Sequence, residues 1–294
     1  MIVGRNISKK FRIPSERRNT VFEEVVAFVK GKKRYEEFWA LKNVSFEVEA
    51  GEIFGITGPN GSGKTTLLAI IANIIYPDEG EIIVNGRITP ILALGVGFNP
   101  ELTARENVYL YGALMGMKRK KMKEKYEEVF EFAELKRFEN MKLKNFSSGM
   151  YARLAFSTAV ATEPDILLVD EVMAVGDMEF QRKCMDEINK LNDNGTTIVF
   201  VSHDVETVRS LCGRAMFLNK GEVIAIGDAE EVVNAYLDFV GDLHKHDVRQ
   251  YIKIVQKQNR NDGAREVERN RKRVKGKGKD KVKMLENGEQ GQNV

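Results

Sequence analysis

The feature that most constrains this 294-residue chain is a glycine-rich stretch at residues 58–65. It reads Gly-Pro-Asn-Gly-Ser-Gly-Lys-Thr and matches G-x-x-x-x-G-K-[ST], a loop whose backbone N–H groups surround nucleotide phosphates. The mostly apolar residues 52–57 predict a buried strand before it, and residues 65–73 predict a helix after it, which is the order that the motif requires. Lys64 is then expected to reach the terminal phosphates, and Thr65 to offer its hydroxyl to Mg²⁺. The stretch therefore predicts a site for ATP or GTP.

The composition is that of a globular protein, because 43% hydrophobic residues are ample for a core. We find no run of about 18 apolar residues that would span a bilayer and no signal-peptide pattern, so we expect the chain to stay in the cytosol. Cys184 and Cys212 fall in segments that look helical and lack metal-ligand spacing. We interpret them as buried thiols without a chemical role.

The net charge of +3 is unevenly distributed along the chain. Residues 241–294 hold 15 Lys and Arg against 8 Asp and Glu, a net +7, whereas residues 1–240 hold 31 against 35, a net −4. The composition predicts that residues 241–294 form a basic, disordered tail. A solvated tail without a specific partner is favoured, and contact with anionic lipid headgroups or with RNA is the alternative.

A second unusual segment lies at residues 16–34. Within it, Val21, Phe22, Val25, Val26 and Val29 form the stripe of an amphipathic helix, with basic residues on both sides. The helix packs against its own domain in one interpretation, and docks against a membrane partner or the headgroup layer in the other.

The rest of the pattern alternates strands with helices. Helical spacing dominates residues 104–162, including the charged stretch 118–134. Strand patterns occur at residues 2–12, 40–57, 166–169, 197–201, 215–218 and 223–226. Such alternation predicts a mostly parallel sheet with helices on its faces.

Three polar residues follow two of these strands. Asp170 and Glu171 end a buried strand, where we expect Asp170 to hold Mg²⁺ and Glu171 to polarise the attacking water as a general base. His203 follows the next strand, and we expect it beside the γ-phosphate.

The stretch Phe-Ser-Ser-Gly-Met at residues 146–150 opens a helix and on its own is only an N-cap. Together with the phosphate loop, the carboxylate pair, the helical insertion and His203, it resembles the signature of ABC ATPases, which usually reads Leu-Ser-Gly-Gly-Gln. The chain resembles an ABC-transporter nucleotide-binding subunit over roughly residues 1–240. The resemblance implies an α/β fold of the P-loop ABC ATPase type. Its parts would be a mostly parallel core sheet, an antiparallel β-subdomain and an α-helical insertion at about residues 95–162.

The resemblance also implies roles for individual residues. Two subunits would close head to tail, so that Ser147, Ser148 and Gly149 of one chain meet the ATP bound by the other. Asp177 would lie at this interface, and Tyr35 would stack on adenine, with Phe38 and Trp39 as competitors for that role. The expected ATP-binding residues are Tyr35, Gly58, Pro59, Asn60, Gly61, Ser62, Gly63, Lys64, Thr65 and Thr66. The expected catalytic residues are Glu171, His203 and Lys64, with Thr65 and Asp170 as Mg²⁺ ligands.

One position departs from the family pattern. The loop before the helical insertion normally carries a Gln that touches Mg²⁺ and the lytic water, yet residues 87–110 contain none. Asn99 and Glu101 are the candidate substitutes.

The departures together resemble one branch, the exporters of O-antigen, capsule and teichoic acid. Members similar to this chain share the Ser-Ser-Gly-Met signature, the Gly-x-Gly-Phe-x-Pro-Glu-Leu-Thr stretch and the extra basic amphipathic helix. The residues after 240 are too few and too charged for the carbohydrate-binding domain of some O-antigen members, so we expect no direct recognition of the glycan.

The resemblance therefore predicts an ATPase homodimer on the cytoplasmic face of the cell membrane, bound to a separate transmembrane permease that exports a lipid-linked polysaccharide. ATP and Mg²⁺ are the expected cofactors. An exporter of another cargo is the first alternative. A soluble protein acting on ribosomes or nucleic acid is disfavoured, since the chain has neither a second cassette nor a long coiled coil.

Overall fold

The structure is a computed structural model that describes residues 1–14, 35–91, 95–170 and 177–241. The chain divides into two compact units, Met1–Tyr236 and Leu237–Val294. The predicted amphipathic helix at 16–34, the predicted base Glu171 and the basic tail from residue 242 lie outside the described residues, so these three predictions stay predictions.

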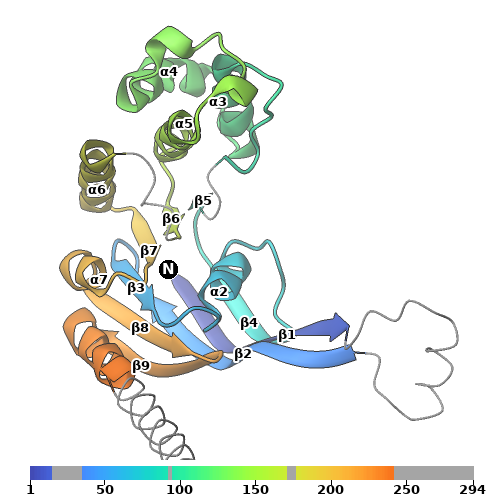
Figure 1. Cartoon of the computed structure of the whole chain (residues 1–294), viewed down its shortest axis with the longest axis vertical. Coiled ribbons are helices and arrows are strands. Elements are labelled where there is room, and N and C mark those ends of the chain that lie inside the picture. Colours follow the sequence, from blue (N-terminus) through green and yellow to red (C-terminus); the bar gives the residue numbers. More distant parts are fainter. Residues whose placement is uncertain (15–34, 92–94, 171–176, 242–294) are drawn as a thin grey trace, which may run out of the picture. The chain divides into compact units, whose positions relative to one another are not determined.

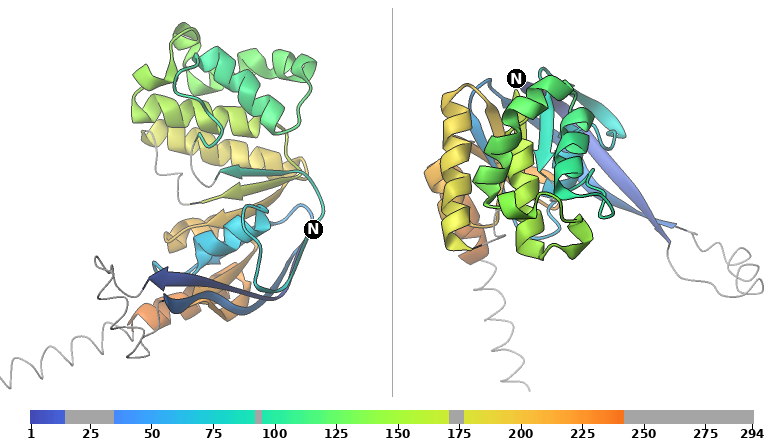
Figure 2. Two further views of the ribbon diagram at one scale, coloured as in Figure 1. Left: turned by 90° about the vertical axis from the view of Figure 1, so that its right-hand side faces the viewer. Right: turned by 90° about the horizontal axis from the view of Figure 1, so that it is seen from above.

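A six-stranded sheet forms the centre of the first unit (Figures 1 and 2). Its strands in spatial order are β5 (Ile88–Ile91), β6 (Ile166–Val169), β7 (Thr197–Val201), β3 (Ile53–Thr57), β8 (Arg214–Asn219) and β9 (Glu222–Asp228). The first five run parallel and β9 is antiparallel to β8. Every residue of β3, β6 and β7 is buried, as expected for parallel strands covered on both faces.

A second sheet is antiparallel and has three strands in the order β2, β1, β4. Their bounds are Tyr35–Val48, Ile2–Pro14 and Glu79–Val84. Helix α2 (Lys64–Ile71) shares one hydrophobic core with both sheets, and its Leu67, Leu68, Ile70 and Ile71 are fully buried. A helix that is apolar around most of its circumference requires cover on more than one side. The phosphate loop that precedes α2 is therefore fixed between the two sheets.

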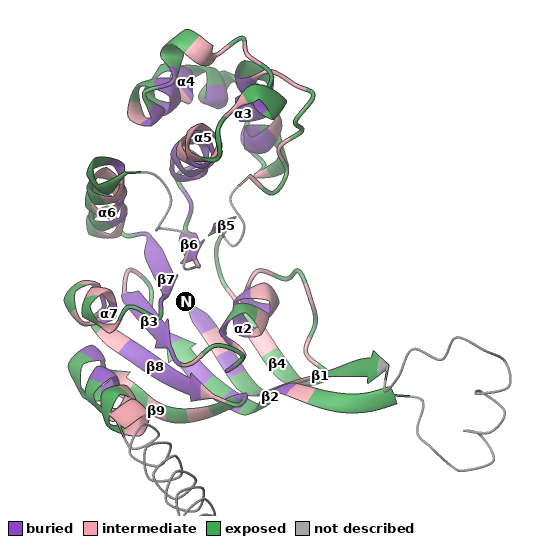
Figure 3. Ribbon diagram, in the orientation of Figure 1, coloured by how far each residue is buried: buried purple, intermediate pink, exposed green. Residues whose placement is uncertain are grey.

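The insertion between β5 and β6 consists of helices α3 (Ala104–Leu114), α4 (Arg119–Ala133) and α5 (Ser148–Val160). Two 3₁₀ turns, Lys136–Phe138 and Leu143–Asn145, connect α4 with α5. These helices enclose a core of their own, which includes Met122, Phe130 and Leu154 (Figure 3). A capping box between Thr103 and Glu106 starts α3.

Two further helices cover the parallel sheet, α6 (Met178–Asp193) and α7 (Val205–Leu211). Phe180 of α6 meets Phe156 of α5 edge-on, with 6.4 Å between ring centroids. Cys184 in α6 and Cys212, which directly follows α7, are both buried, and burial raises the pKa of each thiol to about 12. Within the residues that the structure describes, every helix is too short or too polar to cross a lipid bilayer.

The predicted fold class is confirmed: the chain combines a mostly parallel core sheet, an antiparallel β-sheet and an α-helical insertion. The four strand patterns from residue 166 onward correspond to β6, β7, β8 and β9, and the stretch 118–134 corresponds to α4. Strands β4 and β5 were not foreseen. The sequence pattern did not indicate β4 because four of its six residues are exposed, and β5 is only four residues long with an internal proline.

Candidate functional site

The parallel strands bring the predicted site residues to one edge of the sheet. Ile56 of β3 pairs with Val201 of β7, and Val169 of β6 pairs with Phe200 of β7. The residues that follow these strands therefore leave the sheet side by side, where ligands bind in open α/β sheets. They are the start of the phosphate loop after β3, Asp170 after β6 and His203 after β7.

A pocket of about 230 Å³ opens at this edge. Its lining residues are Phe38, Ala40, Asn60, Gly61, Ser62, Gly63, Lys64, Thr65, Thr66 and Asp170. The pocket thus joins most of the phosphate loop to the first predicted carboxylate. Strand β2 of the antiparallel sheet contributes Phe38 and Ala40 to the lining.

Glycine is required at two positions of the loop. Gly58 has φ +146°, and a Cβ there would lie 2.0 Å from the Leu218 carbonyl oxygen. Gly63 has φ +108°, and its Cβ would lie 2.5 Å from the Ala40 carbonyl oxygen. Both conformations are unfavourable for other residues. The loop passes so close to β8 and β2 that only glycine fits.

The loop presents positive charge to the pocket. Lys64 is 6% exposed, and its Nζ donates to the carbonyl oxygens of Gly58 at 2.8 Å and Pro59 at 3.2 Å. Among the residues that the structure describes, no side chain caps the N-terminus of α2, and its first turn holds no acidic residue. A buried cation beside an uncapped helix N-terminus is a site for an anion. The pocket wall also holds the buried Ser62 hydroxyl, which has no hydrogen-bond partner in the described part of the chain.

Two oxygen ligands suitable for Mg²⁺ line the same pocket. They are the Thr65 hydroxyl and the Asp170 carboxylate. Mg²⁺ is bound through few carboxylates, water and substrate phosphates, so the hydroxyl, the carboxylate and the adjacent anion site fit this ion. Glu171, the predicted base, lies outside the described residues.

The predicted base-stacking residue does not line the pocket, but one of its competitors does. Tyr35 and Phe38 lie three residues apart in β2, so their side chains point to opposite faces of the strand. Phe38 is 49% exposed and lines the pocket beside the phosphate loop. Trp39 is packed under Lys10, whose Nζ lies 5.4 Å from the ring centroid.

The signature residues lie in the helical insertion, outside the phosphate pocket of their own chain. Ser147 is the N-cap of α5 and its Oγ accepts from the Met150 backbone N–H at 3.2 Å. Ser147 and Ser148 are exposed. They are thus accessible to a second chain, as the predicted in-trans role requires.

Asp177 caps the next helix. Its carboxylate accepts from the Phe180 N–H at 2.9 Å and from Arg153 Nη2 at 2.6 Å. The N-cap bond and the guanidinium lower the pKa of Asp177. Arg153 also contacts Glu134 at 2.8 Å, so one cation ties α5 to α4 and α6.

The two candidate substitutes for the missing Gln are engaged locally. The Asn99 side chain accepts from the Glu101 N–H at 3.0 Å, and Glu101 pairs with Lys144 at 3.0 Å. The residue that organises this segment is Asn107, which sequence reasoning missed. It is fully buried, accepts from the Asn99 N–H at 2.6 Å and donates to the carbonyl oxygens of Asn99, Leu102 and Thr103.

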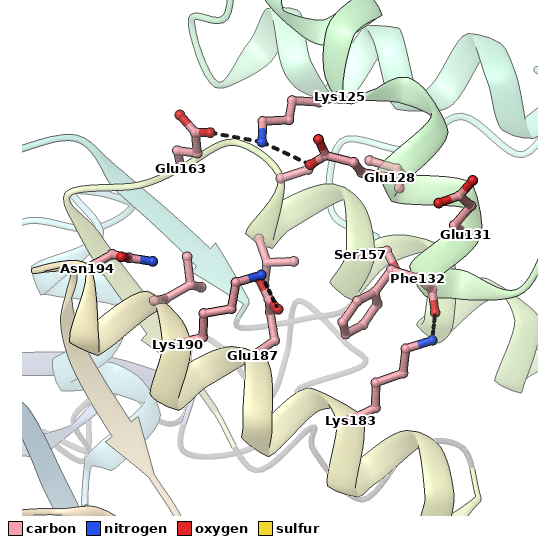
Figure 4. A pocket seen from close by; sticks show the side chains of 14 residues that line it. Lys125, Glu128, Glu131, Phe132, Ser157, Glu163, Lys183, Glu187, Lys190 and Asn194 are labelled. Atoms are coloured by element: carbon pink, nitrogen blue, oxygen red, sulfur yellow. Dashed lines mark hydrogen bonds and ion pairs between the residues drawn. The ribbon is translucent and has the colours of Figure 1, made fainter.

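A larger pocket, of about 510 Å³, lies between α4, α5 and α6 (Figure 4). Five of its seven charged side chains are paired with one another. Lys125 bonds Glu128 and Glu163, and Lys190 bonds Glu187. We assign no chemistry to this pocket.

A phosphate loop enclosed by two sheets, with a helical insertion that carries its own exposed N-cap serines, is the architecture of an ATP-binding cassette. Residues 41–174 match the ABC transporter family, and the chain belongs to that family.

Two of the relatives similar to this chain belong to export systems by their names. The chain is 40% identical over 243 residues to the teichoic acids export ATP-binding protein TagH of Listeria monocytogenes, covering 81% of this chain and 72% of TagH. It is 40% identical over 237 residues to the O-antigen export system ATP-binding protein RfbB of Klebsiella pneumoniae, covering 79% of this chain and 95% of RfbB. The ABC transporter protein AbcA of Aeromonas salmonicida is 45% identical over 199 residues, covering 68% of this chain. The chain spans 65% of the length of AbcA.

Solved structures agree on the fold. The dimeric post-hydrolysis state of the ATP-binding cassette MJ0796 bound to ADP and Pi is 29% identical, with a TM-score of 0.64 over 78% of this chain and 99% of that one. An ATP-binding subunit of an ABC transporter reaches a TM-score of 0.66 at 20% identity, which shows the fold alone.

Proposed function

We propose that this chain binds and hydrolyses ATP as one half of a homodimer, and that it powers export of a lipid-linked cell-surface polysaccharide through a separate permease. The observation that carries the proposal is the buried Lys64 at the uncapped start of α2, in one pocket with Thr65 and Asp170. The cargo rests on the names of TagH and RfbB, which are 40% identical to the chain. Binding to the permease would place the subunit on the cytoplasmic face of the membrane.

The residues of the site have different roles in phosphoryl transfer. Lys64 and the N–H groups of the loop hold the phosphates, while Thr65 and Asp170 are the ligands offered to Mg²⁺. The ion, when bound, neutralises charge that develops on the phosphate oxygens. We assign the role of general base to Glu171 and a contact with the γ-phosphate to His203. Each is the second residue after its strand, β6 or β7, and these two strands are adjacent in the sheet.

The remaining part of the nucleotide lies against β2. We assign the base stack to Phe38 ahead of Tyr35, because Phe38 lines the phosphate pocket and the two side chains lie on opposite faces of the strand. An aromatic stack contributes about 1–3 kcal/mol per base and tolerates different bases.

Dimerisation completes the site. Ser147, Ser148 and Gly149 lie away from the pocket of their own chain, so they serve a nucleotide only if a second copy supplies it. A structure similar to this chain, that of MJ0796 with ADP and Pi, is dimeric. We therefore place two composite sites in the homodimer, with Asp177 near the contact between subunits.

The export role is tested in the organism of origin by replacing the chromosomal copy with Lys64→Ala. We expect surface glycan to be lost and its lipid-linked precursor to accumulate, because export stops while synthesis continues. Purification of the tagged wild-type chain from detergent-solubilised membranes should bring down a multi-span permease. Normal surface glycan in the Lys64→Ala strain would reject polysaccharide as the cargo, and ribosomal proteins or nucleic acid in place of a permease would reject the transport role.

A further inference from the structure

The loop that lacks the family's Gln is attached to the signature helix by a tyrosine. The loop comprises residues 95–98, Gly-Val-Gly-Phe, and follows β5 after the undescribed residues 92–94. Tyr151 extends from α5 and its Oη donates to the Gly95 carbonyl oxygen at 3.1 Å. That oxygen also accepts from the Phe98 N–H at 2.9 Å, so one atom closes the loop and joins it to α5.

The ring of Tyr151 fits against the backbone of the loop. Gly95 has φ +81°, and a Cβ at this position would lie 2.1–2.3 Å from Cε1, Oη and Cζ of Tyr151. Phe98 meets the same ring edge-on with 5.7 Å between centroids, and meets Tyr111 of α3 at the same distance. Gly95 and Tyr151 are therefore complementary: the glycine at 95 leaves the space that the ring occupies.

Tyr151 is also directly bonded to the signature. Its backbone N–H donates to the Ser147 carbonyl oxygen at 2.9 Å, the first hydrogen bond of the α5 ladder. Two hydrogen bonds, both made by Tyr151, thus connect the Gly95 backbone to the N-cap serine. Burial raises the pKa of the Tyr151 phenol, so the hydroxyl keeps its proton and remains a donor.

We propose that Tyr151 is a positioning residue that couples the 95–98 loop to Ser147, so that the loop acts on the nucleotide of the partner subunit through α5. A side chain that reaches the γ-phosphate from the loop is then unnecessary. The local bonds of Asn99 and Glu101, which follow the loop, are compatible with this arrangement. The inference rests on the proposed ATPase and on the in-trans role of Ser147.

The test is steady-state ATP hydrolysis by the full chain in three tyrosine variants. Tyr151→Phe removes the bond to Gly95 and keeps the ring contact, and Tyr151→Leu removes both. Tyr109→Phe is the matched control, because Tyr109 lies in the same helical insertion and stacks on Tyr126, away from the loop. We expect kcat to fall about threefold to tenfold in Tyr151→Phe, as for one neutral hydrogen bond, and further in Tyr151→Leu. KM for ATP should stay within about twofold of wild type, since the phosphate pocket is untouched.

A reciprocal pair separates coupling from simple loss of stability. Gly95→Ala should lower kcat because its methyl group overlaps the Tyr151 ring and because a φ of +81° is strained for alanine. The double variant Gly95→Ala with Tyr151→Leu should lose less activity than the product of the two single-variant losses, because the ring atoms that overlap the methyl group are gone. Thermal unfolding of each variant is measured beside the kinetics.

Two results would overturn the inference while leaving the ATPase intact. The first is a wild-type kcat in Tyr151→Leu. The second is a decrease of kcat in every variant, Tyr109→Phe included, that is explained by the decrease of its melting temperature. Absence of ATP turnover in the wild-type chain would instead reject the proposed function itself.

Discussion

Asn107 provides a sharp test of how the segment between the 95–98 loop and α3 is held. Its side chain has one carbonyl oxygen and two N–H hydrogens, and all of them are used. The oxygen accepts from the Asn99 N–H at 2.6 Å, and Nδ2 lies 2.9–3.2 Å from three carbonyl oxygens. The two hydrogens of Nδ2 are shared among its three acceptors, so the side chain forms the equivalent of three hydrogen bonds, one accepted and two donated. Because Asn107 is fully buried, Asn107→Ala removes these bonds and leaves a gap that is not open to water.

The magnitude follows from these contacts. Three neutral hydrogen bonds at about 1 kcal/mol each give a loss of about 3 kcal/mol in the free energy of unfolding. For a unit of this size the melting temperature should fall by about 6–12 °C. The measurement is urea unfolding followed by far-UV circular dichroism, with Asn145→Ala as the control. Asn145 is exposed in the same helical insertion, and its replacement should cost less than about 0.5 kcal/mol. If Asn107→Ala lowers the free energy of unfolding by less than about 1 kcal/mol at an unchanged m value, Asn107 does not hold the preceding segment as we infer.

The remaining predictions concern the nucleotide and the acid limb of stability. Phe38→Ala should raise KM for ATP about tenfold, from the ~1–3 kcal/mol of a base stack, and Tyr35→Ala should leave it unchanged; the reverse order would assign the stack to Tyr35. Glu171→Gln should keep ATP binding and accumulate a closed dimer on size-exclusion chromatography, whereas normal turnover in this variant would remove Glu171 as the base. The hydrogen bond from Tyr126, together with nearby cations, lowers the pKa of Glu139 from 4.5 to about 2. A lowered folded-state pKa stabilises the fold above pH 4.5, and the effect is lost as the pH falls toward 2. Glu139→Gln should therefore flatten the acid unfolding curve over this interval, and an unchanged curve would contradict the contact.

Much of the fold followed from local patterns. Strands β6 and β7 are continuous apolar runs between polar ends, so their bounds could be predicted to the residue. The conformation of the phosphate loop is indicated by its own residues, because Gly58 and Gly63 adopt backbone conformations that few other residues tolerate. The strand bounds and the loop conformation both depend on residues that are close together in the sequence.

The contacts that could not be predicted depend on pairs distant in sequence. Nothing in the pattern around Phe38 distinguishes it from Tyr35, and only the approach of β2 to the phosphate loop does so. The fit of Tyr151 against Gly95 joins residues 56 positions apart, and a glycine whose neighbour is unknown looks like any turn residue. Asn107 looks like an unremarkable polar residue in a helix until the preceding segment folds over it.

The central claim is that this chain hydrolyses ATP in the pocket built around Lys64, and steady-state turnover of the purified full chain tests it most directly. We predict Mg²⁺-dependent release of phosphate by the wild type and a loss of about 100-fold or more in Lys64→Ala, since a preorganised charge at the transferred phosphoryl group is removed. The variant loses the bonds from Nζ to the Gly58 and Pro59 carbonyl oxygens, so its melting temperature is measured beside its turnover. Equal turnover in wild type and Lys64→Ala would contradict the account.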